Sequence, residues 1–131
     1  MSKKVLIIIL AIFIITIMIS YFMIKIADSK ISLKYEINPT IPAEVKFYVK
    51  NKGVEVVEFN DNYYVFIKLG THSTGGYSIK IEKIETSGRN ARIYVKTESP
   101  RIGEAVTMAF TYPYATVMFN ERPNIKVLYN K

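Results

Sequence analysis

A continuous apolar run opens the chain, and segments in which apolar and polar residues alternate follow it. The run covers Val5–Ile24 and is interrupted only by Thr16, Ser20 and Tyr21. At 1.5 Å of rise per residue, about 20 helical residues span roughly 30 Å, which is the thickness of the hydrocarbon core of a bilayer. The run therefore predicts a transmembrane helix over residues 5–24, with the lipid bilayer as its partner.

The charges that flank this run indicate its orientation. Lys3 and Lys4 precede it, and a smaller net positive charge follows it. The positive-inside rule then places the N-terminus in the cytoplasm. A cleavable signal peptide opens in the same way, but its apolar region is about 7–15 residues long and ends at small residues, whereas Tyr21–Lys25 is bulky. We expect an uncleaved signal anchor over residues 1–27 and an extracytoplasmic domain over residues 28–131 of a single-pass protein of the cell membrane.

The rest of the chain has the alternation of β-strands. Alternate residues of Tyr63–Leu69 share one apolar face, and so do Tyr77, Ile79 and Ile81. Period-2 spacing of β-branched and aromatic residues predicts strands. Further strands are expected within residues 31–37, 54–59, 91–97 and 125–129. These elements predict a mainly β (α+β) fold, in which the transmembrane helix precedes a small antiparallel β domain with one short packed helix.

The short helix is the prediction for Pro42–Lys52. Val45, Phe47 and Val49 alternate as they would in a strand, but the flanking residues carry the start and stop signals of a helix. These signals are an N-cap, an early Pro and Glu, late lysines and a glycine beyond them: Thr40, Pro42, Glu44, Lys50, Lys52 and Gly53. We favour the helix over the strand.

Gly70–Gly76, between the two clearest strands, is dense in Gly, Ser and Thr. Gly75 and Gly76 allow backbone angles that other residues avoid, and they leave backbone amides uncovered by side chains. One interpretation is an ordinary hairpin turn. The other is a presented loop that binds a partner through Thr71, His72, Ser73, Thr74, Gly75, Gly76 and Tyr77.

A second alternating run, Val106–Phe119, is interrupted by Tyr112, Pro113 and Tyr114. Because proline cannot donate to a sheet ladder, Pro113 marks an edge, a bulge or a corner. Tyrosine gives rigid contact area with a polar tip, which suits binding, but tyrosines at a corner could equally pin the loops to the core. We expect Thr71–Tyr77 and Tyr112–Tyr114 to form neighbouring parts of one partner-binding surface.

These two motifs carry a resemblance to a known family. The stretch LGTHSTGGYSIKIEKIE, followed by IYVKTESPRIGEAVTMAFTYPYATV, resembles the PrcB C-terminal domain family over roughly residues 63–119. The family pattern is a strand that ends in Leu-Gly, a Thr-Gly-Gly-Tyr-Ser loop and a later Thr-Tyr-Pro-Tyr corner, with a smaller residue where this chain has Phe110. The family takes its name from a subunit of a bacterial cell-surface protease complex. The resemblance thus implies a protease complex subunit that acts through protein–protein interaction.

Composition narrows the chemistry of the domain. The absence of cysteine excludes disulfides, lipid attachment and thiolate metal sites. The single histidine, His72, is expected to be an exposed loop residue, and its neighbour Ser73 is a poor start for a catalytic triad. Carboxylates such as Glu82 and Glu85 are scattered, and Gly75-Gly76 lacks the lysine of a phosphate loop. We expect no enzyme, no catalytic residue, no metal and no cofactor.

The formal net charge of +7 favours no particular partner by itself. Much of it is expected on the solvent face of strands, for example at Lys80, Lys83, Arg92 and Lys96. Aromatic residues interleaved with lysines are typical of single-stranded nucleic acid binding. The predicted anchor places the domain outside the cytoplasm, so no nucleic acid partner is expected.

Three functions remain open. The first is a membrane-anchored, non-catalytic protein-interaction module, an accessory or stabilising subunit whose protein partner is an extracytoplasmic protease or a similar surface complex. The second is a direct protease inhibitor of the β-sandwich type, because Thr-Gly-Gly-Tyr is similar to the Thr-Thr-Gly-Tyr loop of chagasin-like inhibitors. The third is a structural domain that binds envelope polymer through charge. No residue pattern specifies an oligomeric state.

Overall fold

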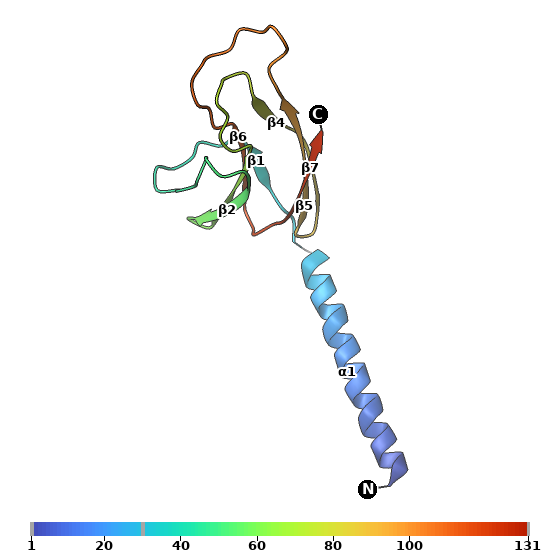
Figure 1. Cartoon of the computed structure of the whole chain (residues 1–131). Helices are drawn as coiled ribbons and strands as arrows, with labels where there is room; N and C mark the ends of the chain where they lie inside the picture. Colours follow the sequence, from blue (N-terminus) through green and yellow to red (C-terminus); the bar gives the residue numbers. More distant parts are fainter. Residues whose placement is uncertain (1, 30, 131) are drawn as a thin grey trace.

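A long helix and a β domain make up the computed structural model, which describes residues 2–29 and 31–130. The described residues do not include Met1, Lys30 and Lys131. Lys30 contributes to the charge expected after the apolar run. Helix α1 projects from one end of the β domain (Figure 1). The elements are α1 Lys3–Ser29, β1 Tyr35–Ile37, β2 Gly53–Phe59, β3 Asn62–Lys68, β4 Ser78–Ser87, β5 Asn90–Glu98, β6 Tyr114–Phe119 and β7 Asn124–Asn130.

Helix α1 confirms the helix expected over residues 5–24 and extends it at both ends. Its 27 residues correspond to about 40 Å. The Ser2 hydroxyl caps it by accepting the Val5 N–H at 3.3 Å, and the Thr16 hydroxyl donates to the Ile12 carbonyl at 2.8 Å. Its large apolar side chains from Val5 to Ile24 are exposed, and Ile26 is half-buried. The helix is long and apolar enough to cross a membrane, a property that signal sequences share.

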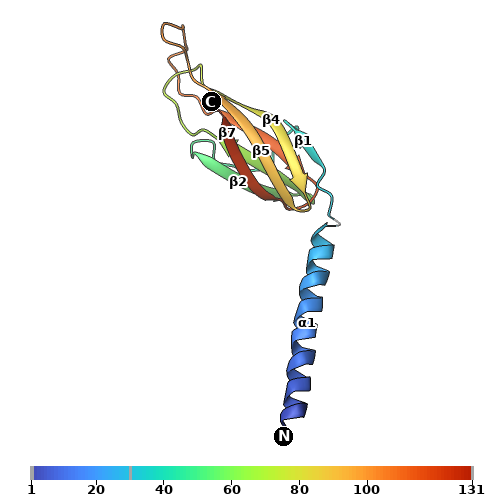
Figure 2. The same cartoon turned by 90° about the vertical axis from the view of Figure 1, so that its right-hand side faces the viewer.

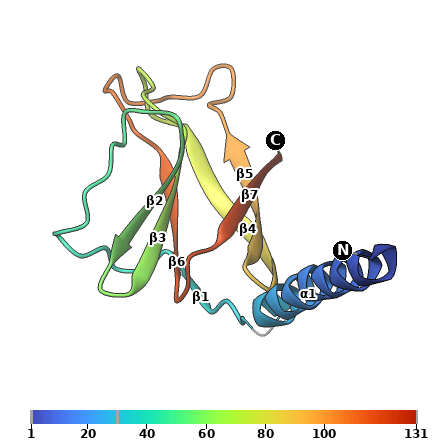
Figure 3. The same ribbon diagram turned by 90° about the horizontal axis from the view of Figure 1, so that it is seen from below.

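The strands form two sheets, which Figures 2 and 3 show from two sides. The four-stranded sheet has the order β1-β6-β3-β2 and is antiparallel throughout. The three-stranded sheet has the order β4-β5-β7, in which β4 and β5 are antiparallel whereas β7 runs parallel to β5. The predicted mainly β, largely antiparallel fold is therefore confirmed, with one parallel pair.

The main core lies between the two sheets. Val65 and Ile67 of β3 share one buried cluster with Ile93 and Val95 of β5. Further buried members are Leu33, Ile79, Ala91, Ala115, Val117 and Phe119. The two apolar faces predicted for residues 63–69 and 77–81 both contribute to this cluster, but they do so from different sheets.

The segment 38–52 covers the outer face of the four-stranded sheet. Phe47 stacks on Phe66 of β3, with ring centroids 3.9 Å apart and planes inclined by 9°, and Val45 is buried beside them. The short helix predicted for Pro42–Lys52 is wrong, because this segment is irregular apart from two turns. Residues two apart lie about 200° apart around a helix, so a helix would turn Val45 and Phe47 to opposite sides, whereas both pack on one sheet face.

The remaining strand predictions differ from the structure only in their ends. Strands β2, β5 and β7 match the segments expected at 54–59, 91–97 and 125–129. The strand expected within 31–37 is shorter, because only Tyr35–Ile37 pairs with β6. Leu33 precedes that strand and is buried in the main core, so the chain is fixed to the domain four residues after α1 ends.

Candidate functional site

The loop that contains the predicted site, residues 69–77, connects β3 in one sheet to β4 in the other. The interpretation of this segment as a hairpin turn is therefore wrong, because the two strands are not hydrogen-bonded neighbours. A second long loop, residues 99–113, returns the chain from β5 to β6. Both loops lie at the end of the β domain away from α1 (Figures 1 and 2).

Backbone hydrogen bonds join the two loops. His72 and Thr111 each donate an N–H to the carbonyl of the other, at 2.9 and 2.8 Å, and form an isolated antiparallel bridge. Gly75 donates to the Thr107 carbonyl at 2.9 Å, and the Thr111 hydroxyl donates to the Thr74 carbonyl at 2.8 Å. The expected neighbourhood of the two motifs is therefore present, and each loop supports the other.

The two adjacent glycines are positions of close packing. Gly75 is buried, and a Cβ there would collide with the Thr107 hydroxyl. Gly76 has a φ of 86°, and a Cβ there would lie 2.8 Å from Pro100 Cγ and 2.9 Å from Val106 Cγ1. The Gly75 N–H is not available to a partner, because the Thr107 carbonyl of the second loop already accepts it.

His72 is half-buried, which corrects the expectation of an exposed loop histidine. Its ring stacks on that of Tyr77, with centroids 4.0 Å apart and planes inclined by 21°. Its Nε2 is enclosed and has no hydrogen-bond partner among the described residues. Thr71, Ser73 and Gly76 remain exposed, so only part of the loop is open to a partner.

The tyrosine corner is attached to the sheet rather than presented. The Pro113 carbonyl accepts the Leu69 N–H at 3.0 Å, and Tyr112 is half-buried. Tyr114 is 40% exposed, and its ring forms a T-shaped contact with Phe47 at a centroid distance of 5.2 Å and an angle of 62°. The structure therefore favours the corner as a pin between the loop and the core.

Sequence reasoning missed the most exposed feature of this end of the domain. Val106, Met108 and Phe110 alternate with small and polar residues as strand residues do, but they lie in the irregular loop 99–113. Ile102 is fully exposed, and Met108 and Phe110 are 86% and 66% exposed. We call Ile102, Met108 and Phe110 the apolar tip. The available signal was Pro100 and Gly103 just before the run and Pro113 within it, because these residues disfavour a continuous strand.

A turn presents the first residue of the apolar tip. Glu104 donates its N–H to the Arg101 carbonyl at 3.0 Å, and its carboxylate accepts the Arg101 N–H at 2.8 Å. Gly103 has a φ of 83°, which is the value that position i+2 of a type II turn requires. Ile102 occupies position i+1 of that turn, so its exposure follows from a fixed backbone.

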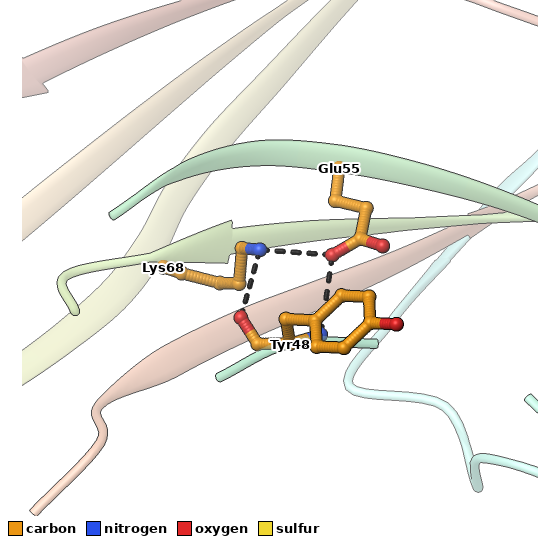
Figure 4. Close-up of polar contacts among 3 residues, drawn as sticks. All are labelled: Tyr48, Glu55 and Lys68. Carbon is orange, nitrogen blue, oxygen red and sulfur yellow. Dashed lines mark hydrogen bonds and ion pairs between the residues drawn. The ribbon is translucent and has the colours of Figure 1, made fainter. Parts of the chain in front are cut away.

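A buried lysine forms a second polar cluster near the loops (Figure 4). The Lys68 side chain is 6% exposed, and its ammonium donates to Glu55 Oε2 at 2.8 Å and to the Tyr48 carbonyl at 2.9 Å. Glu55 Oε2 also accepts the Tyr48 N–H at 3.3 Å. The hydrogen bond from Lys68 holds the pKa of Glu55 below its usual value. The cluster fastens the segment 38–52 to the sheet, and its ammonium is occupied by these contacts.

Within the described part of the chain, no three His, Cys, Asp or Glu side chains gather as metal ligands would. The features open to a partner at this end are polar loop residues and the apolar tip. Contact with a protein surface suits this combination, since apolar anchors surrounded by polar groups are typical of protein interfaces.

Comparisons with known proteins agree with the resemblance found in the sequence. The PrcB C-terminal family model matches residues 63–120, which confirms the predicted similarity to that family over β3 to β6 and both loops. An uncharacterized protein of Methanocaldococcus jannaschii is 28% identical over 102 residues, which are 78% of this chain. The chain spans 62% of the length of that relative. No solved structure matches the chain.

Proposed function

We propose that this chain is a membrane-anchored, non-catalytic protein-interaction module, an accessory or stabilising subunit for an extracytoplasmic protein. The similarity to the PrcB C-terminal family makes a protease the candidate partner. Helix α1 holds the protein in the membrane, with the N-terminus in the cytoplasm and the β domain outside. The length and apolarity of α1 support this arrangement, as do the lysines that precede its apolar run.

The apolar tip carries the proposal. Large apolar side chains that are exposed on a fixed loop favour a partner that covers them. Each Å² of apolar surface that a partner buries contributes about 25 cal/mol of favourable free energy. The loop 99–113, which carries the tip, lies at the end of the domain away from α1 (Figures 1 and 2), so the membrane that α1 spans is not its nearest partner. Exposed Thr71 and Ser73 lie on the adjoining loop and supply polar groups at the rim.

The experiment is capture of the partner in the native membrane. The full-length chain is crosslinked lightly and purified, and the co-purifying protein is compared between the wild type and the variant Met108→Ser/Phe110→Ser. We expect the variant to lose the partner and to keep its fold. The matched control is Val54→Ser on strand β2, which removes a 44% exposed apolar side chain elsewhere on the domain.

Equal capture by the tip variant and the wild type would refute the apolar tip as the binding surface. A protease assay then distinguishes the two protease-related functions. An accessory subunit raises the yield or activity of the captured enzyme, whereas an inhibitor lowers its rate in a saturable way.

A further inference from the structure

The outer face of the three-stranded sheet carries two pairs of like charges. Arg92 of β5 lies directly opposite Lys126 of β7, and Lys80 of β4 lies directly opposite Lys96 of β5. All four residues are exposed. Like charges directly opposite one another destabilise a sheet. The Lys96 ammonium is balanced by the Glu98 carboxylate at 3.3 Å, so the pair Arg92 and Lys126 is the one that indicates a contribution to something other than folding.

The acidic residue opposite Arg92 is already engaged. Glu85 lies opposite Arg92 on β4, and its carboxylate is 2.7 Å from the Lys83 ammonium. It also accepts the Tyr94 hydroxyl at 3.2 Å. The carboxylate is thus shared among several donors, and the positive charge of Arg92 and Lys126 together exceeds what Glu85 can balance.

A hollow lies at the same place. It has a volume of about 560 Å³, and the outward-facing residues that line it include Ser87, Asn90, Arg92, Asn124 and Lys126. Cross-strand pairing places Asn90 beside Asn124 in the next row of the sheet. Guanidinium, ammonium, amide and hydroxyl donors line the hollow together with the Glu85 carboxylate, which already contacts the Lys83 ammonium and the Tyr94 hydroxyl. A phosphate group accepts several hydrogen bonds and carries negative charge, so it suits the donors that Glu85 leaves unbalanced.

The β4–β5 turn and the start of β7, which contribute residues to the lining of this hollow, lie at the end of the domain from which α1 emerges (Figures 1 and 3). Asn124 donates its N–H to the Arg89 carbonyl at 2.7 Å, which joins the start of β7 to the β4–β5 turn. Lys34 donates its N–H to the Asn120 side chain at 2.8 Å, and Asn120 donates its own N–H to the Lys34 carbonyl at 3.1 Å. The chain that leaves α1 is thereby tied to the β6–β7 turn, beside the hollow.

The length of this connection sets the height of the hollow above a bilayer. The helical residues beyond Ile24, up to Ser29, rise about 7.5 Å, and a headgroup layer is about 5–7 Å thick. The four residues from Ser29 to buried Leu33 span at most about 14 Å. The connection therefore holds Leu33 within about 14 Å of the end of α1, which is close enough for the end of the domain that carries Arg92 and Lys126 to reach the phosphate groups of the bilayer.

We propose that the hollow at Arg92 and Lys126 binds the phosphate groups of anionic phospholipids in the membrane that α1 spans. This contact orients the β domain, with the loops 69–77 and 99–113 directed away from the bilayer. The inference rests on the membrane anchoring in the proposed function, and it does not depend on the protein partner of the apolar tip.

The test uses the full-length chain in nanodiscs. The chain has no tryptophan, so Leu128→Trp, which lies opposite Tyr94 on this face, supplies one reporter. Its fluorescence is quenched by phosphatidylcholine that carries a headgroup spin label. Discs of phosphatidylcholine alone are compared with discs of equimolar phosphatidylcholine and phosphatidylglycerol. We expect stronger quenching in the anionic discs and its loss in about 1 M salt, where the Debye length is about 3 Å.

The variant Arg92→Gln/Lys126→Gln should lower the ratio of docked to undocked domain about 25-fold, because each basic residue at an anionic surface contributes about fivefold. The control Lys46→Gln/Lys50→Gln removes the same charge from exposed positions of the segment 38–52 and should leave quenching unchanged.

Three results would overturn the inference. Quenching that is equal in both kinds of disc excludes recognition of anionic lipid. If both double variants lose the same amount of quenching, the attraction to the anionic disc depends on net charge and not on the hollow. If Arg92 and Lys126 bind an acidic protein, and their substitution leaves quenching unchanged, this face of the sheet binds that protein and not the lipid. A chain that separates from the discs overturns both the anchoring and this contact, whereas failed partner capture with normal quenching overturns only the proposed function.

Discussion

Gly75 and Thr107 lie in direct contact across two loops that connect different sheets. The Gly75 N–H donates to the Thr107 carbonyl at 2.9 Å, and the Thr107 hydroxyl occupies the space that a Cβ on Gly75 would fill. The motif that the sequence offered as an open loop is therefore a support for the loop 99–113. Its glycines are explained by close packing, and the residues that remain open are elsewhere.

Gly75→Ala should destabilise the β domain by about 1–3 kcal/mol, the usual cost of forcing an added methyl group into a packed site. The double variant Gly75→Ala/Thr107→Ala should recover most of this loss, because the next nearest Thr107 atoms are 3.5 and 3.6 Å from the added Cβ. Urea unfolding of the full-length chain in detergent, followed by circular dichroism, measures the coupling energy between the two sites. Additive losses would contradict the proposed collision.

Gly76→Ala is the matched variant without such a rescue. Its φ of 86° disfavours any side chain, and the added Cβ would meet both Pro100 and Val106. We expect Gly76→Ala to remain destabilised in the Thr107→Ala background. If Gly76→Ala regained stability in the Thr107→Ala background, the Thr107 hydroxyl would strain the whole loop and not only its contact with residue 75.

Alternation in the sequence predicted which residues face the core but could not predict which strand pairs with which. Val65, Ile67 and Ile79 are buried together as their spacing indicated. The same spacing suits a hairpin and a crossing between two sheets, because both need an apolar face on each strand. Pairing is decided by distant residues, such as Ile67 with Ala115.

Alternation misled where no sheet partner was available. Met108 and Phe110 alternate with small and polar residues, but among the described residues their segment is bridged only at Thr111, to His72. Without a ladder and a facing sheet, their side chains stay exposed. Alternation at Val45 and Phe47 did predict side chains that pack on one face, although the backbone there is neither the predicted helix nor a strand.

Phe47→Ala should destabilise the domain by about 2–3 kcal/mol, since it removes a half-buried ring that stacks on Phe66 at 3.9 Å. The neighbouring variant Tyr48→Ala removes a ring that is 73% exposed and keeps the backbone groups that bind Glu55 and Lys68. We expect its effect to stay within about 0.5 kcal/mol. Equal losses in urea unfolding would show that the segment 38–52 does not dock through Phe47.

Glu55 should make the stability of the domain depend on acid pH. Its pKa is lowered in the folded chain, mainly by the hydrogen bond from Lys68. The unfolded chain therefore binds the proton more readily, so the stabilisation is fully present above the ordinary value of 4.5 and is lost as the pH falls through the lowered pKa. Urea unfolding between neutral and acid pH should show a smaller loss of stability in Glu55→Gln than in the wild type. Parallel pH profiles would contradict this assignment.

Single cysteines test the orientation of the chain, because the chain has no cysteine of its own. Ser73 is exposed on the loop between β3 and β4, whereas Ser2 lies before the first residue of α1, at the end of the helix away from the β domain. A maleimide that cannot cross membranes should label Ser73→Cys in intact cells and Ser2→Cys only after permeabilisation, if lysines before the apolar run keep the N-terminus in the cytoplasm. The opposite labelling would invert the topology. A third outcome is that Ser73→Cys is labelled in a shortened chain that lacks residue 2. This would identify α1 as a removed signal sequence, and the apolar tip would then belong to a released domain.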